Sequence, residues 1–124
     1  MTFDHQNKSQ GFLRIWLASK NSLRGLQWLI NNEAAFKQEC LLLIVAIPLS
    51  YAVADTFALR ALLIVSIVFI LMMEIVNTAI EVVIDRISLE INPLSGVAKD
   101  LGSALVTIAI IMACATWLSV LLFK

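Results

Sequence analysis

The sequence predicts an all-α membrane protein with three transmembrane helices and an N-terminal amphipathic surface helix. Of its 124 residues, 60% are hydrophobic and only 15% are charged, whereas soluble domains have about 25% charged residues. Residues 101–123 form a run of twenty-three positions without a charge, which is enough to cross a hydrocarbon core about 30 Å thick. Two further long apolar stretches precede this run.

Length and charge limit the possible functions. The length suits one domain, residues 1–124, and we expect no separate catalytic domain beside a membrane anchor. Nine Lys+Arg balance nine Asp+Glu, so the chain lacks the excess of basic residues that nucleic-acid binding requires. Two cysteines and one histidine are too few for a Cys/His metal site. We therefore expect the function to lie in or next to the helices.

The first expected helix covers about residues 7–30 and is amphipathic. Apolar residues recur at spacings of three and four and share one face, while basic and amide residues gather on another. A helix with Trp and basic residues is typical of the membrane interface. Packing on the rest of the protein is an equally good explanation, and the two are compatible. The apolar face consists of Phe12, Trp16, Leu23, Leu26 and Ile30.

The three spans are expected at about 34–54, 58–86 and 95–123. Asn31 and Asn32 offer an N-cap for the first span, and Pro48 should kink it. Thr56, after Asp55, is expected to cap the second span. Asn92 and Pro93 are typical of the N-cap and first residue of a third helix.

The distribution of Lys and Arg predicts the orientation in the membrane. Seven of these residues lie before the first span or between the second and third, and only two lie on the other side. By the positive-inside rule, the N-terminus is cytoplasmic and the C-terminus lies outside. The seven are Lys8, Arg14, Lys20, Arg24, Lys37, Arg86 and Lys99, and the two are Arg60 and Lys124.

The second span contains a polar stripe. Glu74, Asn77, Glu81 and Asp85 are spaced by three, four and four residues, so they share one face of a helix. A solvated face would explain Asp85. Glu74, however, lies about 21 Å along the helix from Arg60 and about 10 Å inside the membrane boundary. An ionisable residue at that depth is a candidate functional residue.

Other charged residues are expected at the same membrane level. Glu33 and Glu39 begin the first span, Lys99 and Asp100 begin the third, and Arg14 lies on the surface helix. Oxygen ligands without His or Cys favour Mg²⁺, cations can hold phosphates, and a buried carboxyl can take a proton from a hydroxyl. Together they suit phosphoryl transfer, although no Gly-rich phosphate loop is present.

The pattern leaves two alternatives open. Buried acids also suit a small proton-coupled transporter or channel. The stripe could also be purely structural, with Lys99 neutralising Glu81 or Asp85.

Four segments resemble one protein family, the bacterial integral-membrane diacylglycerol kinases. They are G-F-L-R-I at 11–15, N-E-A-A-F-K-Q-E at 32–39, E-I-V-N-T-A-I-E-V-V-I-D at 74–85 and L-S-G-V-A-K-D-L-G-S-A at 94–104. The resemblance extends over about residues 11–120. A related branch phosphorylates undecaprenol, but the S-G-V-A-K-D-L-G-S-A segment is more similar to the diacylglycerol branch.

The resemblance implies a homotrimer in the bacterial inner membrane, with active sites shared between neighbours. Mg²⁺ and ATP would serve the reaction, with diacylglycerol as acceptor and phosphatidic acid as product. Glu74 matches the catalytic base, and Asn77 belongs to the same stripe. Glu33 and Glu81 match the Mg²⁺-holding residues of the nucleotide site. The remaining matches are nucleotide contacts at Arg14, Glu90, Asn92, Lys99 and Asp100, and lipid contacts at Arg60, Ser103 and Trp117.

Overall fold

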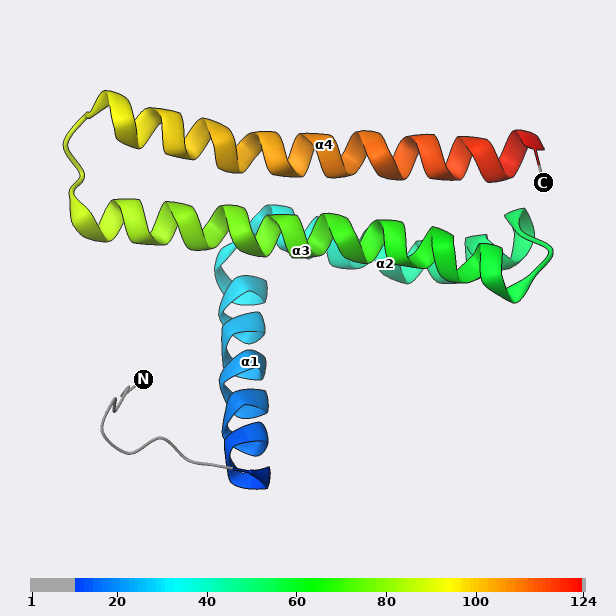
Figure 1. Ribbon diagram of the computed structural model, residues 1–124, viewed down its shortest axis with the longest axis horizontal. Coiled ribbons are helices and arrows are strands. Elements are labelled where there is room, and N and C mark those ends of the chain that lie inside the picture. The colour runs from blue at the N-terminus through cyan, green and yellow to red at the C-terminus, as the bar shows by residue number, and fades with distance from the viewer. Residues whose placement is uncertain (1–10, 124) are drawn as a thin grey trace. The chain divides into compact units, whose positions relative to one another are not determined.

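The computed structural model describes residues 11–123, which form four α-helices and no strand (Figure 1). They are α1 (Phe12–Asn32), α2 (Ala34–Val53), α3 (Phe57–Ile87) and α4 (Pro93–Phe123). The chain divides after Glu33 into two compact units, which we describe separately. Residues 7–10 of the expected surface helix, with Lys8 and Lys124 of the orientation count, lie outside the described residues.

The first unit contributes α1, whose apolar residues are largely exposed. Phe12 is 92% exposed, and Trp16 and Leu23 are more than half exposed. Lys20 places its Nζ 4.5 Å from the centre of the Trp16 ring, an arrangement typical of a cation–π contact.

The junction after α1 differs from the sequence prediction. Asn31 and Asn32 belong to α1, and the Asn32 side-chain amide donates to the Trp28 carbonyl at 2.8 Å. Glu33 is the only residue between the two helices and has an extended backbone. The predicted N-cap role of the two asparagines is therefore wrong. Asn32 instead lies in the last turn of α1, where its side chain gives a carbonyl of that helix an additional donor.

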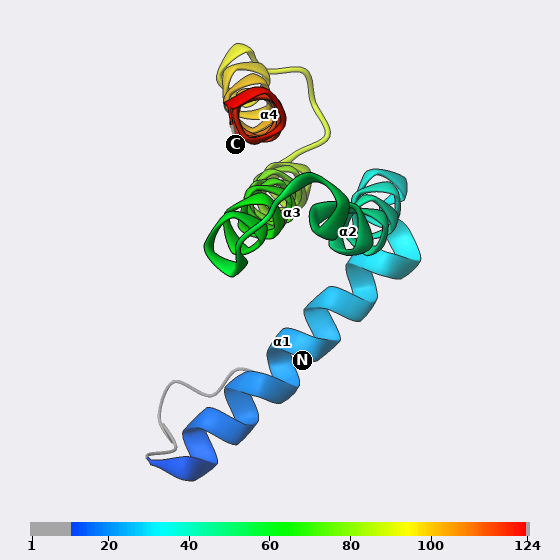
Figure 2. The same cartoon turned by 90° about the vertical axis from the view of Figure 1, so that its right-hand side faces the viewer.

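In the second unit, α3 packs against both α2 and α4 (Figure 2). Within this unit, α2 and α4 run in one direction and α3 runs in the opposite direction (Figure 1). Small residues allow close approach at the core, where Ala109 is fully buried and Ala46 and Ala113 are nearly so. They pack with Ile67 and Ile70 of α3.

Local capping matches two of the predictions. The Thr56 hydroxyl accepts from the Leu59 amide at 3.2 Å, and the Asn92 side chain accepts from the Leu94 amide at 2.8 Å. Pro93 is the first residue of α4, where its missing N–H costs nothing. Pro48 lies inside α2, which continues to Val53.

Three of the described helices, α2, α3 and α4, are long and apolar enough to cross a membrane. Their outward faces are covered with exposed Leu, Ile, Val and Met side chains, as expected where lipid surrounds the protein. With 31 residues each, α3 and α4 are about 46 Å long. They therefore exceed a hydrocarbon core of about 30 Å.

Candidate functional site

The buried stripe of α3 changes from apolar to polar along the helix. It begins with Leu63, Ile67 and Ile70 and continues with Glu74 and Thr78. Glu74 is 6% exposed and Thr78 is 3% exposed. A carboxyl and a hydroxyl thus occupy positions that are filled by Leu and Ile earlier in the same helix. Burying such groups costs free energy unless they find partners, so the polar half of α3 is the candidate site.

The four residues of the predicted stripe differ in exposure. Glu74 is buried, Asn77 and Glu81 are partly buried, and Asp85 is exposed. The stripe therefore leads from the core of the second unit to its surface. Figure 1 shows that α2 begins beside the middle of α3 and runs beside only part of it.

Glu39 of α2 lies within electrostatic reach of Glu74. Its Oε2 atom is buried and has no hydrogen-bond partner among the described residues. Glu39 also lines one end of a groove of about 380 Å³ between the three helices. The other walls of the groove are apolar and include Leu42, Leu49, Ile110 and Trp117.

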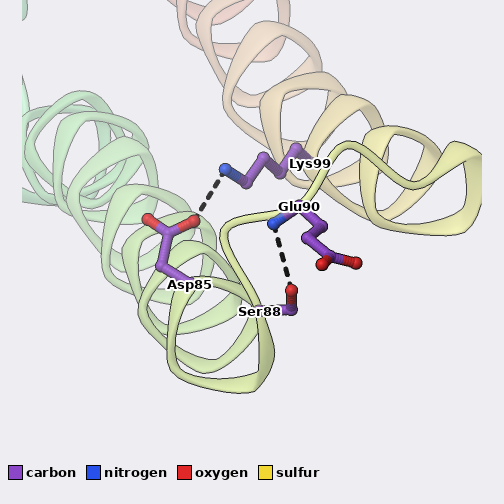
Figure 3. A network of polar contacts seen from close by, with 4 residues as sticks. All are labelled: Asp85, Ser88, Glu90 and Lys99. Carbon is purple, nitrogen blue, oxygen red and sulfur yellow. Dashed lines mark hydrogen bonds and ion pairs between the residues drawn. The ribbon is translucent and has the colours of Figure 1, made fainter.

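A second polar cluster lies where α3 ends and α4 begins. Lys99 Nζ and Asp85 Oδ1 form an ion pair at 2.9 Å, and the Glu90 amide donates to the Ser88 hydroxyl at 3.0 Å (Figure 3). The charge of Glu81 also acts on Lys99. A cavity of about 270 Å³ is lined by Asp85, Glu90, Asn92 and Lys99. The structure thus brings three of the sequence-predicted nucleotide residues around one cavity.

The ion pair bears on one of the alternatives left open by the sequence. Lys99 does neutralise Asp85, as a structural explanation requires. Both side chains are nevertheless about half exposed, at 42% and 50%, and exposed pairs contribute little to stability.

Two predicted lipid contacts lie far from Glu74 along the helices. The Arg60 guanidinium stacks over the Tyr51 ring at 4.6 Å, about 21 Å along α3 from Glu74. The Trp117 indole N–H donates to the Ser66 hydroxyl at 3.1 Å. Ser103 and Asp100 are exposed on α4. Arg14 and Glu33 belong to the first unit.

The carboxylates of the described residues suit Mg²⁺ only if nucleotide phosphates supply further ligands. Within residues 11–123, no three His, Cys, Asp or Glu side chains converge on one point. Mg²⁺ commonly needs only one or two carboxylates when substrate phosphates complete its coordination. Glu81, partly buried on the polar stripe, offers one such carboxylate.

Sequence reasoning assigned no role to Glu39, Thr78 or Ser66, and interpreted Gly102 only as a small residue that permits close helix contact. Glu39 was expected at the correct membrane level only, and Thr78 could have been found because it follows Glu74 by four residues. Ser66 and Gly102 gave no signal beyond their small size, because their importance depends on how α3 and α4 align.

Comparison with known proteins identifies the family. A family model described as prokaryotic diacylglycerol kinase matches residues 20–121. Diacylglycerol kinase of Escherichia coli strain K12 is 45% identical over 111 residues, covering 90% of this chain and 91% of that protein. Those of Haemophilus influenzae and Pseudomonas aeruginosa are 39% and 41% identical, covering 94% and 90% of this chain and 98% and 91% of their own lengths. The chain therefore belongs to the prokaryotic diacylglycerol kinase family of membrane lipid kinases.

Proposed function

We propose that residues 1–124 form a single lipid kinase domain that phosphorylates diacylglycerol with ATP to give phosphatidic acid. The observation that carries the proposal is Glu74, a carboxyl that is 6% exposed and continues the buried Leu and Ile stripe of a membrane helix. Family membership implies a nucleotide co-substrate and a lipid acceptor. A buried carboxyl beside the lipid hydroxyl is the group that such a reaction requires.

In the proposed reaction, the lipid hydroxyl oxygen attacks the γ-phosphorus as the bond to the β,γ-bridging oxygen breaks. ADP leaves with that oxygen, and the hydroxyl proton passes to a carboxylate oxygen of Glu74. Asn77, one helical turn from Glu74, orients the reacting groups.

The nucleotide would be held mainly at the junction of α3 and α4. Lys99 would donate to phosphate oxygens, which requires it to exchange its Asp85 partner for phosphate. The cavity lined by Glu90 and Asn92 would take another part of the nucleotide. Arg14 and Asp100 complete the proposed nucleotide contacts.

Mg²⁺ is proposed to be held by Glu33 and Glu81 together with the phosphates. When bound, it would neutralise charge on the phosphate oxygens as the transferred group develops its transition-state charge. The carboxylates of Glu33 and Glu81 would fix it relative to the polar stripe.

The lipid would enter from the membrane. The apolar groove that ends at Glu39 and is lined by Trp117 supports an acyl chain lying along the helices. Trp117, Ser103 and Arg60 are proposed as lipid contacts, with Arg60 at the far end of α3.

We propose a homotrimer with shared active sites. The exposed apolar faces of α1 and of the spans are surfaces that neighbouring copies and lipid could cover. The charge distribution supports a cytoplasmic N-terminus and an external C-terminus, with α1 as an amphipathic helix in the interface of the inner membrane.

The test is ATP consumption by the purified protein in mixed micelles containing Mg²⁺. Parallel reactions would contain no lipid alcohol, diacylglycerol or undecaprenol. We expect consumption that depends on diacylglycerol. Consumption with undecaprenol alone would retain the mechanism and change the acceptor. No consumption with either lipid by folded protein would contradict the proposal, and flux along a pH gradient in vesicles would then favour a transporter.

A further inference from the structure

A close contact joins α3 to α4 beside Glu74. Gly102 is buried on α4, and a methyl group placed on its Cα would overlap Oδ1 of Asn77. The Asn77 Cγ atom would lie 3.4 Å from that methyl carbon, and Ile80 Cδ1 would lie 3.5 Å from it. The Asn77 amide therefore occupies the space that any larger residue at position 102 would need.

The contact orients the Asn77 amide. Oδ1 is buried and accepts no hydrogen bond among the described residues. The hydrogen on the glycine Cα that replaces the Cβ lies in the same direction, so it comes close to Oδ1 and can form a weak C–H···O contact. With Oδ1 turned towards α4, the two N–H donors on Nδ2 remain for another acceptor.

The contact between Asn77 and Gly102 lies close to the residues proposed for catalysis and nucleotide binding. Asn77 lies one turn after Glu74 and one turn before Glu81 on the same stripe. Gly102 follows Lys99 and Asp100 on α4. The oriented N–H donors thus lie between the proposed base and the proposed nucleotide contacts, where a negatively charged phosphate oxygen would be the acceptor.

We propose that Gly102 is a positioning residue for phosphoryl transfer, because its missing side chain fixes the Asn77 amide with Nδ2 available to a phosphate oxygen. The inference rests on the proposed function of the site. Gly102 itself touches no reacting atom. It acts through Asn77, and any side chain at position 102 would turn or displace the amide.

The chain offers a matched control. Gly25 lies inside helix α1, and a methyl group there would meet no atom within 4 Å. Gly25→Ala and Gly102→Ala therefore make the same chemical change inside a helix, and both raise helix propensity. Only the second change reaches Asn77.

The experiment compares five full-length proteins in diacylglycerol micelles with Mg²⁺ and ATP: the unmodified chain, G25A, G102A, N77A and N77A/G102A. The measurements are kcat, the KM for each substrate, and thermal stability. We expect G102A to lower kcat about 10- to 100-fold, the scale of a displacement near 1 Å. G25A should keep the unmodified kcat. In the N77A background, adding G102A should lower kcat no further, because the amide that it displaces is gone.

Several outcomes would overturn the inference. They are an unchanged kcat in G102A, a change confined to KM, and an equal loss from G102A with and without Asn77. The last would mean that Gly102 serves helix packing alone. If G102A does not fold, recovery of folded protein in N77A/G102A would support the contact, and misfolding of both would overturn it. An unmodified chain that consumes no ATP would instead contradict the proposed function itself, before any variant is compared.

Discussion

Residues 57–70 and 71–87 of α3 differ in how they bury polar groups. In the first part, Ser66 accepts from Trp117 at 3.1 Å and donates to the Leu63 carbonyl at 2.6 Å. Beside this pair, Leu63 is 0% exposed. In the second part and its neighbour α2, three buried oxygen atoms have no partner within residues 11–123: Glu39 Oε2, Asn77 Oδ1 and Thr78 Oγ1. In the first part, Arg60 Nε is a buried nitrogen atom without a hydrogen-bond partner among the described residues.

The difference indicates what each half of the helix is for. A buried polar group without a partner costs about 1–3 kcal/mol, so a purely structural helix should avoid a cluster of them. In the first half of α3, Ser66 is paired with Trp117, and the bond joins α3 to α4. We propose that unpartnered polar groups of the second half, such as the Thr78 hydroxyl, meet molecules that arrive during the reaction.

The largest expected effect is the loss of activity in Glu74→Gln, in the second half of α3. The variant keeps the shape of the side chain but cannot accept the hydroxyl proton, so kcat should fall about 100- to 10,000-fold. Thermal stability should be unchanged or higher, because an ionisable group has left a buried position. The measurement is lipid-dependent ATP consumption, and full turnover by this variant would remove Glu74 from its proposed role.

Leu63→Ala should affect stability rather than chemistry. Leu63 is 0% exposed and its neighbour Leu62 is 50% exposed, so Leu62→Ala is the matched control. The buried change leaves a cavity and should lower the free energy of unfolding by about 2–5 kcal/mol. Denaturation by SDS in mixed micelles would measure this. Equal destabilisation by both variants would show that the first half of α3 is not a specifically packed region.

Glu81→Gln and Glu33→Gln should each raise the Mg²⁺ concentration that gives half-maximal activity, by about tenfold. The reason is the loss of one negatively charged oxygen ligand. Asp55→Asn is the control, because Asp55 lies at the opposite end of α3. Mg²⁺ titration curves that coincide for all four proteins would refute the metal assignment.

Ser66→Ala tests the hydrogen bond between Ser66 and Trp117 in the first half of α3. It removes the acceptor of the Trp117 N–H while leaving the indole in place, and should cost about 1 kcal/mol of unfolding free energy. Trp117→Phe should cost a similar amount, and the double variant should cost less than the sum. Strict additivity in unfolding experiments would mean that the hydrogen bond contributes nothing.

The smallest expected effect is that of Asp85→Asn. The variant releases Lys99 from an exposed ion pair and removes a negative charge near the nucleotide cavity. The KM for ATP should therefore fall by about twofold at low salt, and less at high salt because exposed charges are screened. A rise in this KM would show instead that Asp85 is needed to position Lys99.

Local features of the fold could be predicted from the sequence. The Thr56 and Asn92 caps depend only on residues two or three positions away, and the burial of Glu74 follows from its depth in an apolar helix. The structural alternative had Lys99 neutralising Glu81 or Asp85, and the structure pairs it with Asp85. Asn32 was predicted wrongly because either of two adjacent helix ends could use its side chain.

Contacts between helices could not be predicted in the same way. Asn77 meets Gly102, and Ser66 meets Trp117, because α3 and α4 run antiparallel in one particular alignment. A shift of one residue between the two helices would pair different side chains while leaving every local pattern unchanged. The roles proposed for Arg14 and Glu33 depend in addition on neighbours in the assembled protein.

The length of α3 has a consequence for how the two substrates meet. Glu74 is the eighteenth residue of the helix, about 25 Å along it, so about 20 Å of helix continues beyond it towards the α3–α4 turn. The lipid can then stay in its leaflet while the water-soluble nucleotide approaches from the aqueous side. The encounter with the lipid becomes a two-dimensional search within the membrane plane. Turnover should follow the mole fraction of diacylglycerol in the micelle, and diluting micelles of fixed composition should leave the rate per protein unchanged.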